Sequence, residues 1–200
     1  MADLFEKLLK NAGPLGQHRE RAHGYFAFPK LEGEISSRMK FRGKDMIVWS
    51  LNNYLGLANH PEVRKADADG ARDFGLAYPM GARMMSGNSN LHERLEAELA
   101  AFEMKEDAVL LNFGYQGMLS VIDVLCGRHD VIVYDAESHA CIIDGLRMHP
   151  GHRYVFKHND VEDCEKQLQR ATALVEKQKT GGILLITDRK STRLNSSHLV

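Results

Sequence analysis

Cysteine is scarce in this sequence, and its scarcity excludes two kinds of site. The 200 residues include three cysteines, Cys126, Cys141 and Cys164. They are odd in number, widely spaced and form no C-x-x-C pair, so neither a structural zinc site nor a disulfide framework is indicated. The scattered histidines pair with no carboxylate at metal-ligand spacing, and we expect no metal site. A reducing cytoplasm is the simplest compartment for such a chain.

Long hydrophobic runs and a surplus of either charge are also missing. No apolar run approaches the ~20 residues that cross a bilayer. Residues 1–10 mix charged and apolar side chains and lack a signal-peptide core. The 26 Lys and Arg residues nearly balance the 27 Asp and Glu residues, which argues against a dedicated nucleic-acid binder. We therefore expect no membrane span and no nucleic-acid partner.

What the chain does contain is typical of a globular protein. Hydrophobic residues make up 44% of it and charged residues 26%, and no internal repeat is found. Residues 1–30 are expected to form a leader with apolar residues at helical spacing. Residues 34–50 predict a β-hairpin that turns at 42–45. Pro61 suits the first turn of a helix expected to run to about Phe74.

From Asn90 onward, predicted helices and strands alternate. Leu91, Leu95 and Leu99 lie on one face of a helix. Apolar runs predict strands at 108–111, 131–134, 154–156 and 183–186. Further helices are predicted around 118–125, 142–148 and 161–175. Because the strands are continuous apolar runs, the pattern is typical of an α/β protein whose parallel sheet is covered on both faces. Such sheets bind ligands at the carboxyl ends of their strands, here near 112–117, 135–141 and 187 onward.

Two predicted strand-to-helix junctions carry candidate chemistry. At the first, Gly114 would let backbone amides at a helix N-terminus approach a phosphate. Glycine at such a turn more often serves the turn alone, so that alternative stays open. At the second, His139 suits stacking on a ring or acid–base work, because its ordinary pKa lies near neutrality. The alternative is that Ser138 or Asp135 caps a helix and His139 is merely exposed.

Two residues before Asn90 are further candidates. Asn52 lies in a loop after the hairpin. Arg83 lies between glycines, where it suits bidentate binding of a carboxylate or phosphate, unless it is a surface arginine. A Ser-His-Asp hydrolase is disfavoured, because neither the 86–89 segment nor Ser138 shows the G-x-S-x-G elbow.

Together these segments resemble the α-oxoamine synthases, a family that uses pyridoxal 5'-phosphate (PLP) to join an amino acid to an acyl thioester. The resemblance covers roughly residues 20–188, with the segments in the order and spacing of the family. The segments are NNYLGLANHP (52–61), GAR followed by SG (81–87), HERLE (92–96), GY (114–115), SHA (138–140), IIDG (142–145) and HND (158–160).

The resemblance implies a fold-type I PLP-dependent transferase, an α/β fold. Residues 1–60 would form an N-terminal arm with the hairpin, and residues 61–188 part of the large PLP-binding domain with its mainly parallel sheet. The family is homodimeric, with its site at the subunit interface, and its substrates are an amino acid and an acyl-CoA or acyl-carrier protein.

The resemblance also implies roles for single residues. Gly114 and Tyr115 would lie against the cofactor phosphate. His139 would stack on the pyridine ring and handle protons. Asn52 would help to hold the carboxylate of the amino-acid substrate, and Arg83 is the second candidate for substrate binding.

Residues 189–200 depart from the family pattern. The family continues after Asp188 towards an Asp that contacts the pyridinium nitrogen and towards the Schiff-base lysine, and this sequence carries neither. The segment resembles the translation of a sequencing adapter, although a genuine disordered polar tail is the alternative. We expect the 200-residue chain to be an inactive fragment whose full-length parent carries the activity.

Three hypotheses of function follow. The first is a decarboxylative acyltransferase that yields a 2-amino ketone. Met80 and the pair Met84-Met85 favour a long-chain, sphingoid-like or sulfonolipid product over a biotin-pathway or threonine-catabolic role. The second is a PLP-dependent aminotransferase. The third is a catalytically dead, truncated paralogue that regulates a full-length partner.

Overall fold

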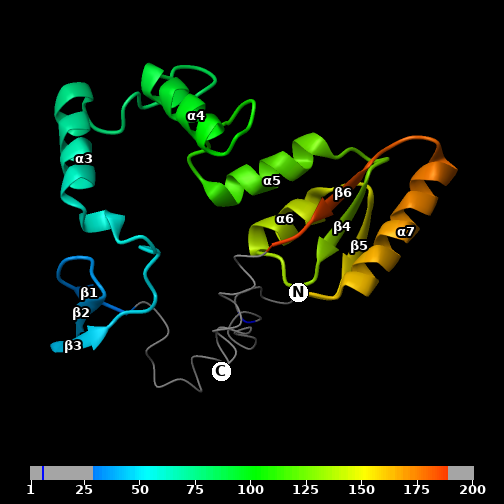
Figure 1. Cartoon of the computed structure of the whole chain (residues 1–200), viewed down its shortest axis with the longest axis horizontal. Helices are drawn as coiled ribbons and strands as arrows, with labels where there is room; N and C mark the ends of the chain where they lie inside the picture. The colour runs from blue at the N-terminus through cyan, green and yellow to red at the C-terminus, as the bar shows by residue number, and fades with distance from the viewer. Residues whose placement is uncertain (1–5, 7–28, 189–200) are drawn as a thin grey trace. The chain divides into compact units, whose positions relative to one another are not determined.

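The chain forms two compact units, Met1–Asn90 and Leu91–Val200. The computed structural model describes residue 6 and residues 29–188. Apart from Glu6, the expected leader helix lies outside the described residues, and so does the segment 189–200 (Figure 1). In the described part, no helix is both long enough and apolar enough to span a bilayer.

The first unit contains the expected hairpin. Strands β2 (Arg38–Phe41) and β3 (Lys44–Ile47) pair antiparallel, which confirms the prediction. Arg42 and Gly43 join them with φ of 52° and 75°, the left-handed geometry whose twist matches that of a hairpin. A third strand, β1 (Leu31–Glu32), pairs with β2 and was not expected. Two residues are too short a run to show an apolar–polar period.

Helix α3 belongs to the same unit. It runs from Pro61 to Phe74 as expected, with proline in its first turn and Gly75 after it at φ 84°. It packs against the 3₁₀ helix η1 (Leu57–Asn59), which directly precedes it. The expected arm of residues 1–60 stays a prediction. Helix α3 and the segment before it belong to the same compact unit, Met1–Asn90.

The second unit contains a parallel sheet in the order β5-β4-β6. Its strands are β4 (Val131–Asp135), β5 (His152–Phe156) and β6 (Ile183–Ile186). The central strand β4 places Val131 opposite both His152 and Ile183. Val131, Ile132 and Val133 are fully buried, which confirms the parallel, two-face-covered strand predicted from the apolar run.

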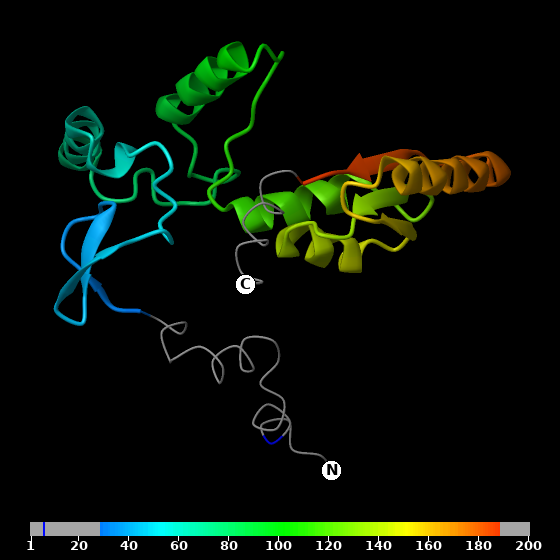
Figure 2. The same ribbon diagram turned by 60° about the horizontal axis from the view of Figure 1, so that its bottom comes forward.

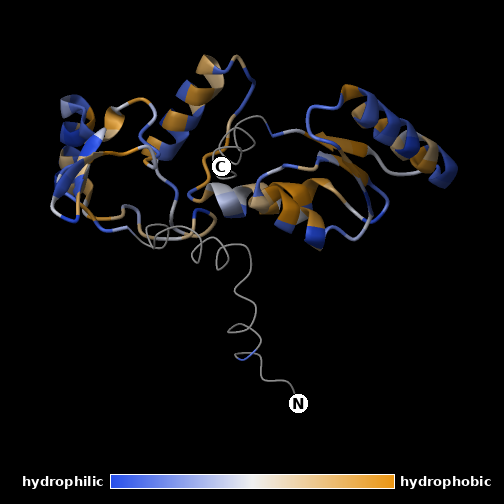
Figure 3. Ribbon diagram, turned by 90° about the horizontal axis from the view of Figure 1, so that it is seen from below, coloured by the Kyte–Doolittle hydropathy of each residue, from blue (hydrophilic) through white to orange (hydrophobic). Residues whose placement is uncertain are grey.

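Helices cover both faces of this sheet. Helices α5 (Gly114–Leu125) and α6 (Ala140–Met148) lie on one face and α7 (Val161–Gln178) on the other (Figure 2). Because strand side chains alternate, Ile132 packs with Ile122 and Leu146 on the α5–α6 side, whereas Val133 packs towards α7. Figure 3 shows the hydrophobic residues gathered in the strands and on α5 and α6. The core therefore anchors the loops at the carboxyl ends of the strands.

The expected strand at 108–111 is wrong. Helix α4 (Asn90–Phe102) forms as predicted, but residues 108–111 have no regular secondary structure and pair with no strand. The backbone N–H of Leu110 donates to the Glu96 carboxylate of α4 at 2.6 Å, so a side chain takes the place of a sheet partner. Val109 is 73% exposed, as expected of a residue outside the sheet.

Candidate functional site

The N-terminus of α5 has the features of an anion site. The helix begins at Gly114, and no side chain caps it. A Cβ placed on Gly114 would meet no atom within 4 Å, so the space beside this residue is open. The first turn of a helix presents backbone N–H groups and a partial positive charge. A phosphate therefore fits at this end of α5.

Tyr115, in the first turn of α5, is tied to α6. Its hydroxyl donates a hydrogen bond to the carboxylate of Asp144. Arg147 Nη1 lies 2.6 Å from the other oxygen of the same carboxylate. The bond to Asp144 raises the pKa of Tyr115, and the bond from Tyr115 lowers the pKa of Asp144. Asp144 thus fixes the Tyr115 ring from the neighbouring helix.

We expect Asp144→Asn to lower the pKa of Tyr115 towards its ordinary value of 10.0. The amide still accepts a hydrogen bond but carries no charge to disfavour the phenolate. The measurement is an ultraviolet titration of phenolate absorbance, with Tyr115→Phe in both backgrounds to isolate this one tyrosine. A Tyr115 titration that is the same in Asp144→Asn and in the parent would contradict the coupling.

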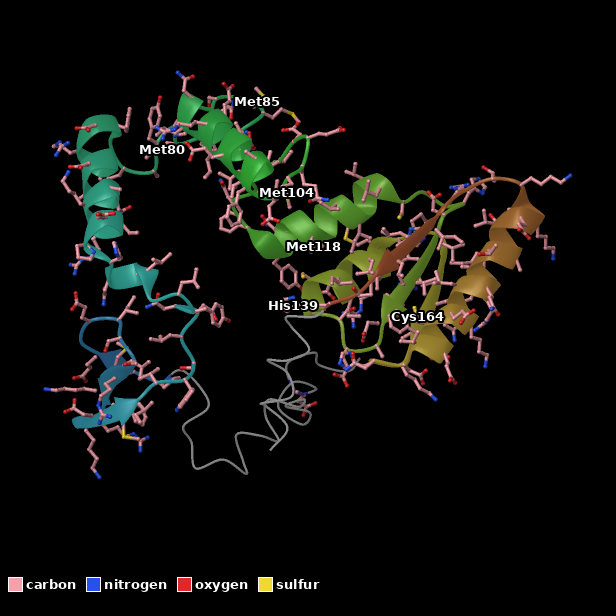
Figure 4. The ribbon with its side chains drawn as sticks, in the orientation of Figure 1. Met80, Met85, Met104, Met118, His139 and Cys164 are labelled. Atoms are coloured by element: carbon pink, nitrogen blue, oxygen red, sulfur yellow. The ribbon has the colours of Figure 1, made fainter. Side chains whose placement is uncertain are left out.

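His139 lies at the start of α6 (Figure 4), and its ring is paired with that of Tyr115. The two rings meet edge to face, with centroids 6.2 Å apart and planes at 72°. The backbone N–H of His139 donates to Asp188 Oδ2 at 3.0 Å, which links it to the end of β6. Nδ1 of its ring accepts from the backbone N–H of Cys141 at 3.2 Å. His139 itself, not Ser138 or Asp135, therefore caps α6.

A second polar cluster joins the ends of β4 and β5. The buried carboxylate of Asp135 accepts from the backbone N–H of Glu137 at 2.8 Å and from His158 Nδ1–H at 2.9 Å. Glu137 Oε2 lies 3.9 Å from the other ring nitrogen of His158. The bond to Asp135 raises the pKa of His158. This cluster holds the loop that carries His139.

The His158–Asp135 pair makes the stability of the protein depend on pH. A histidine whose pKa is raised by folding stabilises the folded state below its ordinary value of 6.5. That contribution disappears as the pH rises through the raised value. We expect His158→Gln to lower the free energy of unfolding more at about pH 6 than at about pH 9.

Denaturant unfolding at both pH values measures this difference. The matched control is His152→Gln, at the exposed start of β5. Equal losses at the two pH values in His158→Gln would contradict a charged pair.

The other two candidates lie in the first unit. Asn52 Oδ1 accepts from the hydroxyl of Tyr54 at 3.0 Å. The guanidinium of Arg83 donates to Asn88 Oδ1, with nitrogen–oxygen distances of 3.2 Å and 2.9 Å. The second unit thus brings together Gly114, Tyr115 and His139, whereas Asn52 and Arg83 belong to Met1–Asn90.

Four participants in the site carried no role in the sequence analysis. Asp144 fixes Tyr115, Cys141 contacts the His139 ring, Asp188 holds its backbone, and His158 pairs with Asp135. Two of them, Asp144 and His158, lie in the IIDG and HND segments that resemble the family. That resemblance was the feature of the sequence from which their place in the site could have been predicted. Across residues 29–188, no three His, Cys, Asp or Glu side chains are grouped to hold a metal ion.

Curated proteins similar to this chain include two named as acyltransferases and several named as 8-amino-7-oxononanoate synthases. It is 58% identical over 188 residues to a cysteate-C-fatty acyltransferase of Capnocytophaga ochracea, covering 94% of this chain and 44% of the relative. It is 37% identical over 145 residues to a serine palmitoyltransferase of Bacteriovorax stolpii, covering 72% of this chain and 34% of the relative. It is 37% identical over 172 residues to an 8-amino-7-oxononanoate synthase of Citrifermentans bemidjiense, covering 84% of this chain and 41% of the relative. The chain thus spans less than half the length of these relatives.

Solved structures and a family profile agree with these relatives. A serine palmitoyltransferase from S. paucimobilis, with a bound PLP–myriocin aldimine, matches with a TM-score of 0.75 and 26% identity over 92% of this chain and 52% of that one. The Sphingomonas wittichii serine palmitoyltransferase matches with a TM-score of 0.74 and 27% identity at the same coverage. The expected fold-type I architecture is confirmed. A profile described as aminotransferase class I and II matches residues 44–187, and the chain therefore belongs to that family.

Proposed function

We propose that the protein containing this chain is a PLP-dependent acyltransferase that condenses an amino acid with a fatty acyl thioester. The observation that carries the proposal is the pairing of the His139 ring with Tyr115 at the uncapped N-terminus of α5. A phosphate site beside an aromatic, titratable ring suits a phosphorylated aromatic cofactor. The relatives named above supply the reaction class.

The residues of the second unit fit PLP. The first turn of α5 would bind its phosphate, since Gly114 leaves room for close backbone approach. His139 is exposed at the start of α6, with its ring available for stacking on the pyridine. The Ser138 hydroxyl is buried and has no hydrogen-bond partner among the described residues, so it offers one more polar contact at this loop.

The chain's own residues would then prepare the reaction. PLP, when bound, supplies an electron sink for negative charge at the substrate Cα. Tyr115 and the α5 amides would orient the cofactor phosphate, and His139 would lie against the ring plane and move a proton at the reacting carbon. Asn52 would help to bind the substrate carboxylate, as the family resemblance implies, and Arg83, whose guanidinium suits bidentate binding of a carboxylate, is the second candidate. Overall, an amino acid and an acyl thioester would give a 2-amino ketone, carbon dioxide and a free thiol.

The relatives also indicate the substrates. The names of two of them specify fatty acyl or palmitoyl transfer, to cysteate in one and serine in the other. Identity is higher to the cysteate enzyme, 58% against 37%. We therefore propose cysteate as the amino acid and a long-chain acyl thioester as the donor, with a homodimer as the working form. These choices agree with the long-chain preference inferred from Met80 and Met84-Met85.

Thiol release tests this function. The complete protein, supplied with PLP and palmitoyl-CoA, is assayed for free coenzyme A with cysteate, serine or alanine as the acceptor. We expect release that depends on the amino acid and is fastest with cysteate. Transfer of the amino group to a 2-oxo acid without thiol release would instead show an aminotransferase. The absence of both activities would refute the proposal.

Residues 1–200 taken alone are expected to turn over no substrate. Among the described residues, the side-chain hydrogen bonds and ring contacts of Tyr115 and His139 are with Asp144, Cys141 and each other, and none involves a lysine. A PLP acyltransferase needs such an amine to hold its cofactor. The same thiol assay on the isolated 200-residue polypeptide checks this, and turnover would contradict it.

A further inference from the structure

The imidazole of His139 is held by two residues, although His139 itself is exposed. Tyr115 of α5 packs against the ring in an edge-to-face pair. Nδ1 of the ring lies 3.2 Å from the backbone nitrogen of Cys141 and 3.0 Å from its sulfur. Asp188 fixes the main chain of His139 at the same time. Of the three, Cys141 alone contacts a ring nitrogen.

The Cys141 contacts determine which ring nitrogen of His139 carries the proton. A backbone N–H only donates, so Nδ1 must present its lone pair to it. The ring proton then sits on Nε2, and the ring is neutral. Burial raises the pKa of the Cys141 thiol, so the sulfur keeps its proton at neutral pH and its S–H can donate to Nδ1 as well. The thiol contact is thus compatible with the tautomer that the backbone N–H requires.

The Cys141 sulfur is suited to this task because it cannot move freely. Cys141 is 7% exposed and belongs to the core cluster of Ile122, Ile132, Ile142 and Leu146. Since this cluster packs α5 and α6 on the sheet, the thiol is a fixed reference point for the exposed ring. Without the thiol, the backbone bond at 3.2 Å would be the one remaining contact that the described residues make to a ring nitrogen of His139, and rotation of the imidazole about its Cβ–Cγ bond would be less restricted.

We propose that Cys141 is a positioning residue that locks the His139 ring, with Nδ1 as acceptor and Nε2–H as the only proton that the ring offers to a reacting group. The consequence for catalysis rests on the function proposed above. The tautomer itself is a property of the folded chain and does not depend on it. The tautomer of His139 can therefore be tested separately from its effect on catalysis.

Nitrogen NMR tests the structural part. The complete protein is labelled with ¹⁵N-histidine, and the His139 signals are assigned by their loss in His139→Gln. We expect a protonated Nε2 and an unprotonated Nδ1. We expect the chemical-shift difference between the two nitrogens to shrink in Cys141→Ala and to return in Cys141→Ser, whose hydroxyl can donate in place of the thiol. Cys126→Ala, a deletion in the same cluster, should leave the His139 signals unchanged.

The outcomes are distinct. A proton on Nδ1 in the parent protein overturns the inference, even if no variant folds. Unchanged nitrogens in Cys141→Ala, or a failure of Cys141→Ser to restore them, also overturn it. In the thiol assay we expect kcat to fall about 3- to 10-fold in Cys141→Ala, with little change in KM and recovery in Cys141→Ser. The predicted tautomer in a protein without thiol release would refute the function and leave the positioning role intact.

Discussion

His139→Ala is expected to lower the turnover number of the acyltransfer reaction by about 10²- to 10⁴-fold, the range of a positioned acid–base group. The substitution removes both the ring proposed to stack on the cofactor and the proposed proton carrier. We also expect weaker PLP binding, measured by titration of cofactor absorbance, because the stacking ring would be lost and Tyr115 would lose its ring partner. Steady-state thiol release gives the turnover number.

His152→Ala is the matched control for this substitution. His152 begins β5, at the end of the sheet opposite to the Asp135–His139 loop, and is exposed. We expect its turnover and cofactor affinity to equal those of the parent. If His139→Ala kept most of the turnover, or if His152→Ala lost as much, His139 would have no special role.

Gly145→Val is expected to have the largest effect on the packing that supports the site. A Cβ on Gly145 would lie 2.9 Å from Ile122 Cδ1 and 3.4 Å from the Leu119 main chain. The α5–α6 contact has no room for the branched side chain, and such overpacking costs about 1–3 kcal/mol of folding free energy. Displacing α6 from α5 would also break the Tyr115–Asp144 bond. Denaturant unfolding measures the first effect, and the Tyr115 titration measures the second.

Gly114→Val provides the comparison within the same pair of helices. A Cβ there meets nothing within 4 Å, so we expect no loss of folding free energy from crowding. The added side chain would instead cover the α5 amides and weaken PLP binding. If Gly114→Val bound PLP normally, the phosphate site would not lie at this helix end. If Gly145→Val were as stable as the parent, tight packing between the two helices would not matter for the fold.

Elements formed by local pattern were predicted well from the sequence. The hairpin, α3 and the three parallel strands occur where the residue pattern placed them. In each case one local feature was enough to predict the element, such as Pro61 in the first turn of α3 or the apolar run 131–134 of β4. A strand that is covered by helices on both faces needs apolar residues on both faces, so a continuous apolar run in the sequence indicates that both faces are covered.

The 108–111 segment shows where that reasoning fails. Its apolar run has the length of a buried strand, but strand formation requires a partner with free backbone groups. Here the Glu96 carboxylate accepts the Leu110 N–H, and Val109 remains exposed. Residue type alone does not encode which group satisfies a backbone amide.

The sequence by itself indicated the α/β class and most of the helices and strands, and its motif segments made Gly114, Tyr115 and His139 candidate site residues. Only the tertiary structure decided how those residues are held. Asp144 meets Tyr115, and Asp188 meets His139, across 29 and 49 positions of chain. Local patterns report the burial of a residue. Distances between side chains so far apart in the sequence depend instead on how α5, α6 and β6 pack together. The local sequence pattern does not predict that packing.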